Sequence, residues 1–314
     1  MKKLMLLLLA LLLTGCATHP LPEVAQSLPP EIEAPLPGAP DTLVSSDTVT
    51  LWFRYLDEPL LAPETRAISL SPDQPMEYAL LSALLAGPDI QSTSLTGLFP
   101  AGTRLLSTVK QGRTLFVTLS REIMNGYPDE PALWQNDPYW AAEMPLRRRL
   151  CMQSLIATVT ENCDIDAVQV LLEQQGDVTD SLRLRQRYYL DTDDEKQLAD
   201  PLTRDNGLLL SPGTAMTTVL SLWQQRDWTR LLRYVATDDE DALTNTLDQL
   251  PALLDFSLSG PTLAGRTATF TLTARLRVPT GAFIRADRVL KLREENGLWR
   301  ITPEQLTGWL EGTP

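Results

Sequence analysis

Histidine is almost missing from this chain of 314 residues, because His19 is the only one. Without a second histidine, the later part of the chain cannot assemble Ser-His-Asp or Cys-His catalysis. It also cannot build a zinc site that uses imidazole ligands. We therefore predict no catalytic residues, no metal site and no cofactor.

Cysteine is scarce as well, with Cys16, Cys151 and Cys163 as its only positions. The segment between the last two is typical of a helix, because its apolar side chains recur at helical spacing: Met152, Leu155, Ile156 and Val159. A helix of that length rises about 18 Å, whereas the Cα atoms of a disulfide lie roughly 4.4–6.8 Å apart. We therefore expect two buried free thiols and no disulfide between Cys151 and Cys163.

Long apolar runs are limited to one, Leu4–Leu13, which follows Lys2-Lys3. It is too short to span a bilayer core of about 30 Å as a stable helix, and it is typical of a secretory signal over residues 1–15. Leu13-Thr14-Gly15-Cys16 then resembles the bacterial lipoprotein box, which implies cleavage before Cys16 and lipidation of its thiol. The alternative is an ordinary signal peptide with an incidental cysteine.

Positive charge is also in short supply, since 27 Lys and Arg face 40 Asp and Glu, a formal net charge of −13. Removal of Lys2 and Lys3 with the signal leaves 25 against 40, or −15. A field of that sign does not attract nucleic acid or anionic lipid. We expect the lipid on Cys16 to be the membrane attachment, on the outer face of the bacterial cell membrane, or in the outer membrane if the host has one.

Residues 16–47 contain seven prolines, five acids and no Lys or Arg. Such a stretch cannot bury a core, and its prolines favour an extended polyproline conformation. We predict a tether that holds the folded part of the chain away from the membrane.

Folded character begins near Thr48, where alternating apolar residues predict a strand. Further strands are predicted at 104–109, 114–120 and 167–172, and helices at 75–85 and 146–162. The first helix ends at Gly87-Pro88, where glycine provides a C-cap and proline prevents continuation. The order β-α-β-β-α-β predicts an α+β domain over residues 48–176.

Several motifs in these residues resemble the GerMN domain, a family that takes its name from a sporulation and germination lipoprotein. They include Leu84-Leu85-Ala86-Gly87-Pro88 at the helix end and Leu98-Phe99-Pro100-Ala101-Gly102-Thr103 in a following turn. The resemblance implies a fold similar to the ring-building domains of envelope machines, with no known catalytic residues. The sporulation member of the family carries two such domains in tandem, whereas the second half of this chain has no copy of either motif.

Residues 177–206 are polar and include the acidic run Asp191–Glu195. We predict that they form a connection between domains, with one short strand at 184–190. This run, like Asp238–Asp241, lacks the spacing of an EF-hand calcium loop, so solvated acids are expected.

A second domain is predicted over residues 207–314. Ser211-Pro212 is typical of a helix start and precedes a helical pattern at 215–225. Strict alternation from Ala268 to Val278 predicts an antiparallel strand with one solvated face. Helices followed by an antiparallel sheet resemble the NTF2-like envelope domains, so the second domain is also predicted to be α+β.

Three consecutive arginines, Arg147, Arg148 and Arg149, are candidate contacts with a partner. The helix pattern from 146 places them at the start of the second helix. They could grip an anionic partner, or they could point to water and balance nearby acids.

Aromatic residues form a second candidate contact group. Trp134, Tyr139 and Trp140 lie in a predicted loop over residues 121–144. Trp and Tyr are enriched in interface hot spots. The alternative is that these rings pin the long loop to its own domain.

Together these features predict a non-catalytic envelope lipoprotein that acts as an interaction or assembly module in cell-envelope or sporulation-related complexes. Its expected partner is another envelope protein. Two alternatives stay open: a lipoprotein that binds an apolar or glycan ligand, and an enzyme that acts on wall glycan through two carboxylates. The oligomeric state, including a homo-oligomer, is also left open.

Overall fold

The computed structural model describes residues 45–174, 177–189, 198–278 and 280–311. The predicted signal, Cys16 and most of the predicted tether lie outside the described residues. Residues 45–47, which the composition assigned to the tether, belong instead to the first strand. No helix in the described ranges is long and apolar enough to cross a membrane.

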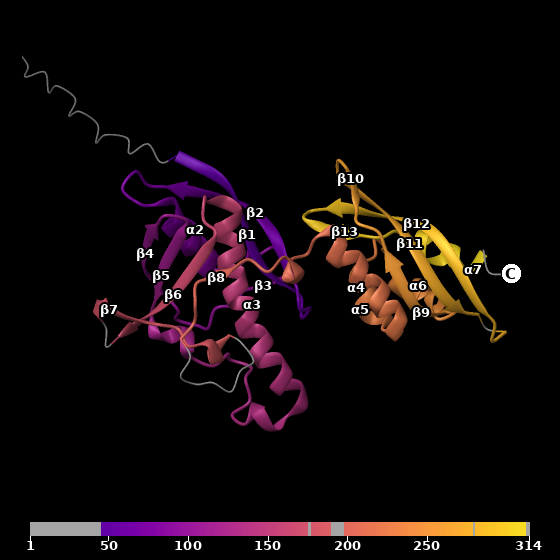
Figure 1. Ribbon diagram of the computed structural model, residues 1–314, viewed down its shortest axis with the longest axis horizontal. Coiled ribbons are helices and arrows are strands. Elements are labelled where there is room, and N and C mark those ends of the chain that lie inside the picture. The colour runs from indigo at the N-terminus through magenta and orange to yellow at the C-terminus, as the bar shows by residue number, and fades with distance from the viewer. Residues whose placement is uncertain (1–44, 175–176, 190–197, 279, 312–314) are drawn as a thin grey trace, which may run out of the picture. The chain divides into compact units, whose positions relative to one another are not determined.

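A three-stranded antiparallel sheet opens the described part of the chain (Figure 1). It has the order β2-β1-β3 and consists of β1 (Ser45–Tyr55), β2 (Leu61–Leu70) and β3 (Leu95–Thr96). β1 contains the strand predicted from Thr48, and its residues from Leu51 to Tyr55 are all buried. The sequence pattern does not reveal β2, because Pro63 and the charged residues after it obscure its alternation.

A second sheet has the order β4-β5-β6-β7, with β8 also paired to β6. Its strands are β4 (Leu105–Gln111), β5 (Thr114–Leu119), β6 (Ala167–Gln174), β7 (Asp177–Arg183) and β8 (Leu202–Thr203). β5 and β6 are parallel because a helix connects them, and the other pairs are antiparallel. The predicted connection thus contributes two strands to this sheet, and residues 186–188 form a 3-10 turn where a strand was expected.

Both predicted helices of this region are present. α2 (Met76–Leu85) is followed by Gly87 with a φ of +90°, the left-handed conformation expected of a C-cap glycine. α3 (Pro138–Asn162) begins earlier than predicted and continues through Pro145. Cys151 and Cys163 are both free, as predicted, although only Cys151 is fully buried.

Side chains of both sheets, α2 and α3 share one apolar core, which includes Leu51, Leu80, Val117, Leu155 and Val170. The predicted elements therefore occur in the predicted order and the region is α+β. The additional strands divide its β structure into two sheets.

The chain from Ser211 onward is α+β as well (Figure 1). Its helices are α4 (Pro212–Gln225), α5 (Trp228–Leu232), α6 (Glu240–Leu247) and α7 (Pro303–Glu311). Its sheet contains β9 (Ala252–Leu258), β10 (Thr262–Ala264), β11 (Thr267–Arg277), β12 (Phe283–Glu295) and β13 (Leu298–Arg300). The order is β10-β11-β12-β13, and β9 also pairs with β11.

β11 confirms the predicted alternation, because every second side chain from Ala268 to Leu276 is at most 1% exposed. These side chains share a core with Trp223 of α4 and Trp309 of α7, whose rings meet edge to face at 5.4 Å. The sheet face that could have lined an apolar ligand cavity is therefore filled by the protein's own helices.

The turn between β1 and β2 joins the two regions. Tyr55, Leu60 and Ala62 belong to the second core rather than the first. The backbone N–H of Leu210 donates to the carbonyl of Leu61 at 2.7 Å. The described residues therefore form one compact unit, in which two cores share one hairpin.

Candidate contact surface

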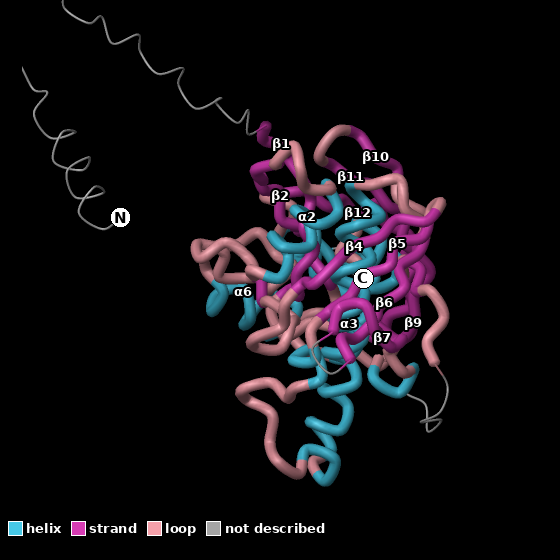
Figure 2. Tube along the Cα trace, turned by 90° about the vertical axis from the view of Figure 1, so that its left-hand side faces the viewer, coloured by secondary structure: helices cyan, strands magenta, loops and turns pink. Residues whose placement is uncertain are grey.

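The N-terminal half of α3 and the segment before it carry the predicted contact residues. Figure 2 shows α3 and the loop beside it. The carboxylate of Asp137 accepts hydrogen bonds from the backbone N–H groups of Tyr139 (2.9 Å) and Trp140 (3.2 Å), and Pro138 occupies the first helical position. Both features favour a helix start. Tyr139 and Trp140 are therefore helical, and the Asp-Pro pair is the sequence signal that locates this start.

The other candidates also differ in local structure from the prediction. Trp134 lies in a short 3-10 turn over Trp134–Asn136. Arg147, Arg148 and Arg149 lie well inside α3 rather than at its start. The three arginines consequently point in different directions and meet different partners.

Arg147 is the most highly paired of the three. Its guanidinium donates to both carboxylate oxygens of Asp129 at 2.7 Å and, through Nε, to Glu143 at 2.7 Å. It also lies 5.3 Å from the ring centroids of Tyr127 and Trp140. The hydrogen bond from Arg147 lowers the pKa of Asp129, so this carboxylate stays ionised. Arg147 therefore holds the loop onto the helix.

Arg148 and Arg149 have separate contacts. The Arg148 guanidinium lies 5.7 Å from the ring of Trp134 and 5.2 Å from that of Tyr188. Arg149 donates to Asp205 at 2.8 Å. The two predicted contact groups, arginines and aromatic rings, are thus brought together as cation–π pairs. Tyr139 is the exception, because 59% of it stays exposed and its ring meets only that of Trp140 among the described rings.

A buried ion pair lies next to Arg147, between Arg54 of β1 and Glu143 of α3. These residues are only 4% and 7% exposed. Arg54 also donates to the carbonyls of Asp57 (2.7 Å) and Glu58 (3.0 Å). Burial raises the pKa of Glu143, but hydrogen bonds from Arg54 and Arg147 outweigh that effect, and the pKa ends below its ordinary value.

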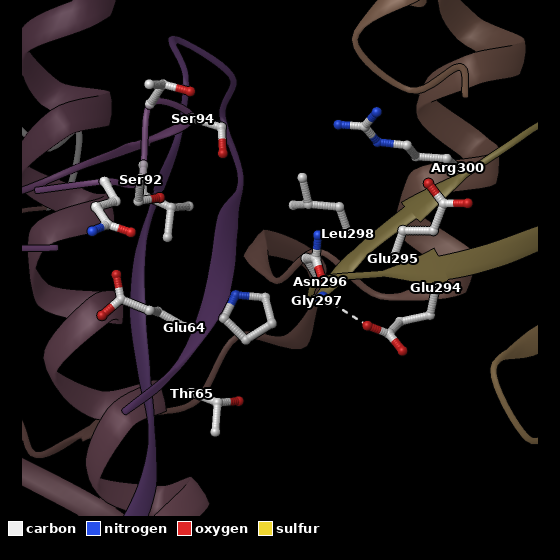
Figure 3. Close-up of a pocket in the computed structure, with 14 residues that line it drawn as sticks. Glu64, Thr65, Ser92, Ser94, Glu294, Glu295, Asn296, Gly297, Leu298 and Arg300 are labelled. Carbon is white, nitrogen blue, oxygen red and sulfur yellow. Dashed lines mark hydrogen bonds between the residues drawn. The ribbon is translucent and has the colours of Figure 1, made fainter. Parts of the chain in front are cut away.

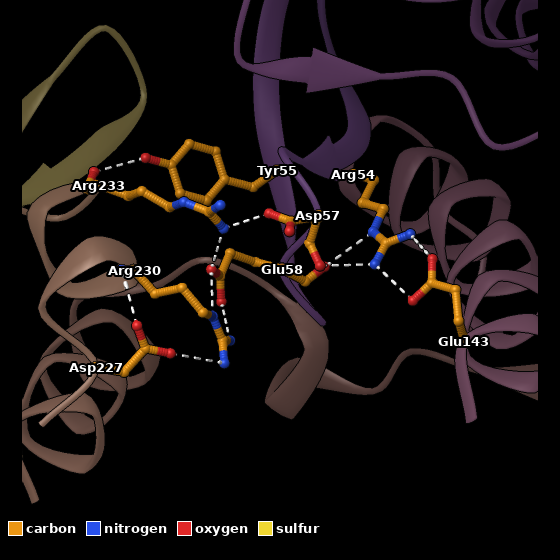
Figure 4. A network of polar contacts seen from close by, with 8 residues as sticks. All are labelled: Arg54, Tyr55, Asp57, Glu58, Glu143, Asp227, Arg230 and Arg233. Atoms are coloured by element: carbon orange, nitrogen blue, oxygen red, sulfur yellow. Dashed lines mark hydrogen bonds and ion pairs between the residues drawn. The ribbon is translucent and has the colours of Figure 1, made fainter. Parts of the chain in front are cut away.

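The same turn carries a second ionic cluster around Glu58, which is fully buried (Figure 4). Its carboxylate accepts from Arg230 at 2.5 and 3.0 Å and from Arg233 at 2.6 Å. The Tyr55 hydroxyl donates to the carbonyl of Arg233 at 2.7 Å. Residues 54–58 therefore connect α3 to the helices of the second region through polar contacts as well as apolar ones.

A surface pocket of about 420 Å³ opens beside these ion pairs. One wall is the turn of the Phe-Pro-Ala-Gly-Thr motif, where Gly102 has a φ of +84° and the Thr103 hydroxyl donates to the carbonyl of Pro100 at 2.7 Å. The Tyr127 hydroxyl ties the loop to this turn through the carbonyl of Leu98 at 2.9 Å. The lining residues include Leu98, Phe99, Ala101, Tyr127, Asp129, Tyr139, Glu143 and Arg147.

A larger pocket of about 640 Å³ lies between the β2 and β3 segments and the β12–β13 turn (Figure 3). Three carboxylates line it, from Glu64, Glu294 and Glu295. Glu64 accepts the backbone N–H of Asp89 at 2.9 Å. The N–H of Gly297, at 2.6 Å, lowers the pKa of Glu294, and Arg266 adds to the effect.

Acid–base catalysis by two carboxylates needs one carboxyl whose pKa is raised. The shifted carboxyl groups among the described residues all have a lowered pKa: Asp57, Glu122, Asp129, Glu143, Asp166, Glu294 and Glu304. No group of three or more His, Cys, Asp or Glu side chains in the described ranges could hold a metal ion.

Comparison with known families identifies the first region. The family described as "Germane: Sporulation and spore germination" matches residues 50–177. These residues make up less than half of the chain, and we call them the Germane region after the family to which they are similar. The Germane region includes the turn of the Phe-Pro-Ala-Gly-Thr motif, which we call the signature turn, both ion pairs of Arg147 and the whole of α3. The family description names no reaction.

No curated protein matches this chain. Among solved structures, the tandem GerMN domains of the sporulation protein GerM from Bacillus subtilis are 16% identical, with 55% of this chain and 50% of that chain covered and a TM-score of 0.33. The chain thus spans half the length of that structure. A putative lipoprotein from Clostridium perfringens is 20% identical, with 46% and 92% covered and a TM-score of 0.26.

A putative SnoaL-like polyketide cyclase from Mesorhizobium loti is 15% identical, with 29% of this chain and 95% of that chain covered and a TM-score of 0.22. These three likenesses are distant, and their low TM-scores do not establish a shared function. The Germane assignment rests on the family match alone.

Proposed function

We propose that this chain is a lipoprotein, anchored through Cys16 at the outer face of the bacterial cell envelope. Its Germane region acts as a non-catalytic module that binds another envelope protein during sporulation or germination. The sequence of residues 1–16 supports the anchor, and the family description supports the process.

The observation that carries the binding role is the pocket beside the signature turn. Four of its charged side chains, Asp129, Glu143, Arg147 and Arg54, pair with one another and are held in place. Leu98, Phe99 and the exposed Tyr139 supply apolar and aromatic surface beside them. A preformed aromatic surface loses little conformational freedom on binding, and such surfaces often supply the hot spots of an interface.

The test is chemical crosslinking in native membranes, followed by identification of what is captured. Tyr139→Ala should reduce capture about tenfold, the effect of losing one moderate hot-spot side chain. Phe283→Ala is the matched control, because Phe283 is a 68% exposed aromatic residue of the second region. Equal capture by wild type and both variants would refute the proposed surface. Trp134 and Trp140 are poorer probes, since both stack on arginines of their own domain.

The anchor is tested separately in the same membranes. Cys16→Ser should leave the detergent phase, because acyl chains contribute about 0.8 kcal/mol of membrane affinity per buried CH₂. Retention of this variant in the detergent phase would refute the lipid anchor and leave the contact surface unaffected.

A further inference from the structure

A second pocket of the first region has a volume of about 370 Å³ and includes Arg148, the neighbour of Arg147, in its lining. Its walls come from α3, the end of β7 and the 3-10 turns Arg121–Met124 and Gln186–Tyr188. The lining residues are Met124, Arg148, Leu172, Leu182, Arg183, Leu184, Arg185, Arg187 and Tyr188. None of the contacts described above for the signature-turn pocket involves this lining.

The pocket combines an apolar floor with a basic rim. Leu184 and Tyr188 are buried, whereas Leu182 and Met124 are 57% and 49% exposed at its edge. Four of its lining residues are arginines, in a chain with a net charge of −13. Among the described residues, Arg148, Arg183 and Arg185 have no carboxylate partner, in contrast to Arg147 and Arg149.

Guanidinium groups bind carboxylates through paired hydrogen bonds, so this rim is complementary to acidic side chains. Burying the exposed side chains of Leu182 and Met124 against an apolar group of the ligand would be favourable, and an inorganic anion has no such group. A ligand that is both acidic and apolar meets both conditions.

The position of β7 in its sheet indicates that the ligand is a peptide. β7 is the last strand in the order β4-β5-β6-β7, so among the described residues it presents a sheet edge that ends near the pocket, where Arg185 pairs with Leu198. An extended segment can add to such an edge through backbone hydrogen bonds, and its alternate side chains then reach neighbouring pockets. We propose that β7 and this basic pocket bind an extended acidic segment of a partner protein, with an apolar side chain beside its carboxylates.

The probe is a fluorescent peptide of alternating Asp and Leu, with binding to the detergent-solubilised full chain measured by anisotropy. Arg183→Gln with Arg185→Gln should weaken binding about tenfold, and so should Leu182→Ser. The matched controls are Arg277→Gln with Arg285→Gln and Leu263→Ser, which change exposed residues of the second region. The controls should bind as wild type does.

Several results would overturn the proposal: no binding to wild type, equal losses in the control variants, or equally tight binding of an alternating Lys and Leu peptide. Full displacement of the peptide by inorganic phosphate at the same concentration would show that the pocket recognises charge alone, which also overturns it. Because Tyr139 lies outside this pocket, failure here leaves the proposed function to its own test.

Discussion

The two regions of this protein bury different kinds of side chain. All the polar and charged side chains buried among the described residues lie between Arg54 and Gln169, in the first region. The region after Ser211 buries apolar side chains on one sheet face, in strict alternation along β11. The first core therefore depends on specific pairs of polar or charged side chains, whereas the second depends on the alternation of apolar and polar residues along its strands.

This difference has an energetic consequence. A buried charge is strongly destabilising once its partner is removed, whereas a buried apolar side chain loses transfer energy and leaves a cavity. In the first region, Arg54 and Glu143 are 89 residues apart in sequence and depend on each other. In the second region no buried side chain among the described residues carries a charge.

The largest effect is expected for Glu143→Ala, which leaves Arg54 buried without its carboxylate. We expect a loss of about 4 kcal/mol in the free energy of unfolding, measured by chemical denaturation. Adding Arg54→Met should recover part of this loss, because the unpaired charge is then gone. Asp166→Ala, which breaks an exposed pair with Arg113, is the control and should leave the denaturation midpoint nearly unchanged. If the two single variants behave alike, the buried pair is not a determinant of the first core.

Leu272→Ala probes the second core and should cost about 3 kcal/mol, because the cavity left by this fully buried side chain cannot be repaired by changing one partner. Val289→Ala, at a position that is 60% exposed, is the control in the same sheet. A loss from Leu272→Ala no greater than that of the control would mean that the sheet face is not filled, which reopens the question of a cavity.

Gly87→Val should cost about 1 kcal/mol, because a side chain at this position must adopt the left-handed conformation. No atom lies within 4 Å of the added Cβ, so the cost comes from the backbone and not from a clash. Gly260→Val is the matched control, because Gly260 also has open space around the position of an added Cβ but does not have a positive φ. Equal melting temperatures for the two variants would contradict the C-cap role of Gly87.

The smallest effect is expected for Asp129→Asn, because the Asp129 side chain is 55% exposed and such pairs contribute less than about 1 kcal/mol. The folded pKa of Asp129 lies below its ordinary value of 3.8, so its carboxylate stabilises the fold above that pH. The contribution is lost as the pH falls through the folded pKa. The difference between variant and wild type should therefore shrink below pH 3.8, and a difference independent of pH would refute the pairing.

The sequence predicts the parts of this fold that depend on neighbouring residues. The alternation of β11, the end of α2 at Gly87 and the capping of α4 by Ser211 all follow from local pattern, and the structure confirms each of them. Where two local signals conflict, the prediction fails. The helix predicted from residue 146 starts earlier in the structure, because Asp137-Pro138 provides the cap and α3 accommodates the internal Pro145.

Contacts between distant residues could not be predicted in this way. The sequence singles out Arg147, Arg148, Trp134 and Trp140, but nothing local indicates that these arginines stack on these rings. That arrangement exists because the loop before α3 folds back along the helix. Arg54 and Glu58 carry no sequence signal at all, since their partners come from α3 and from the second region.

The shared hairpin has a consequence for the order in which the protein can fold. Glu58 is synthesised 172 residues before Arg230 and 175 residues before Arg233, and the core around Tyr55 also needs Trp309 of the last helix. In a growing chain the Glu58 carboxylate therefore stays unpaired until Arg230 and Arg233 emerge, and the apolar side chains around Tyr55 stay exposed until Trp309 emerges. Contacts between residues that lie so far apart in the sequence form slowly. A chain truncated before α7 should therefore leave the apolar side chains around Tyr55 exposed, far from the point of truncation. We expect chaperones and proteases to recognise this early segment as well as the truncated end.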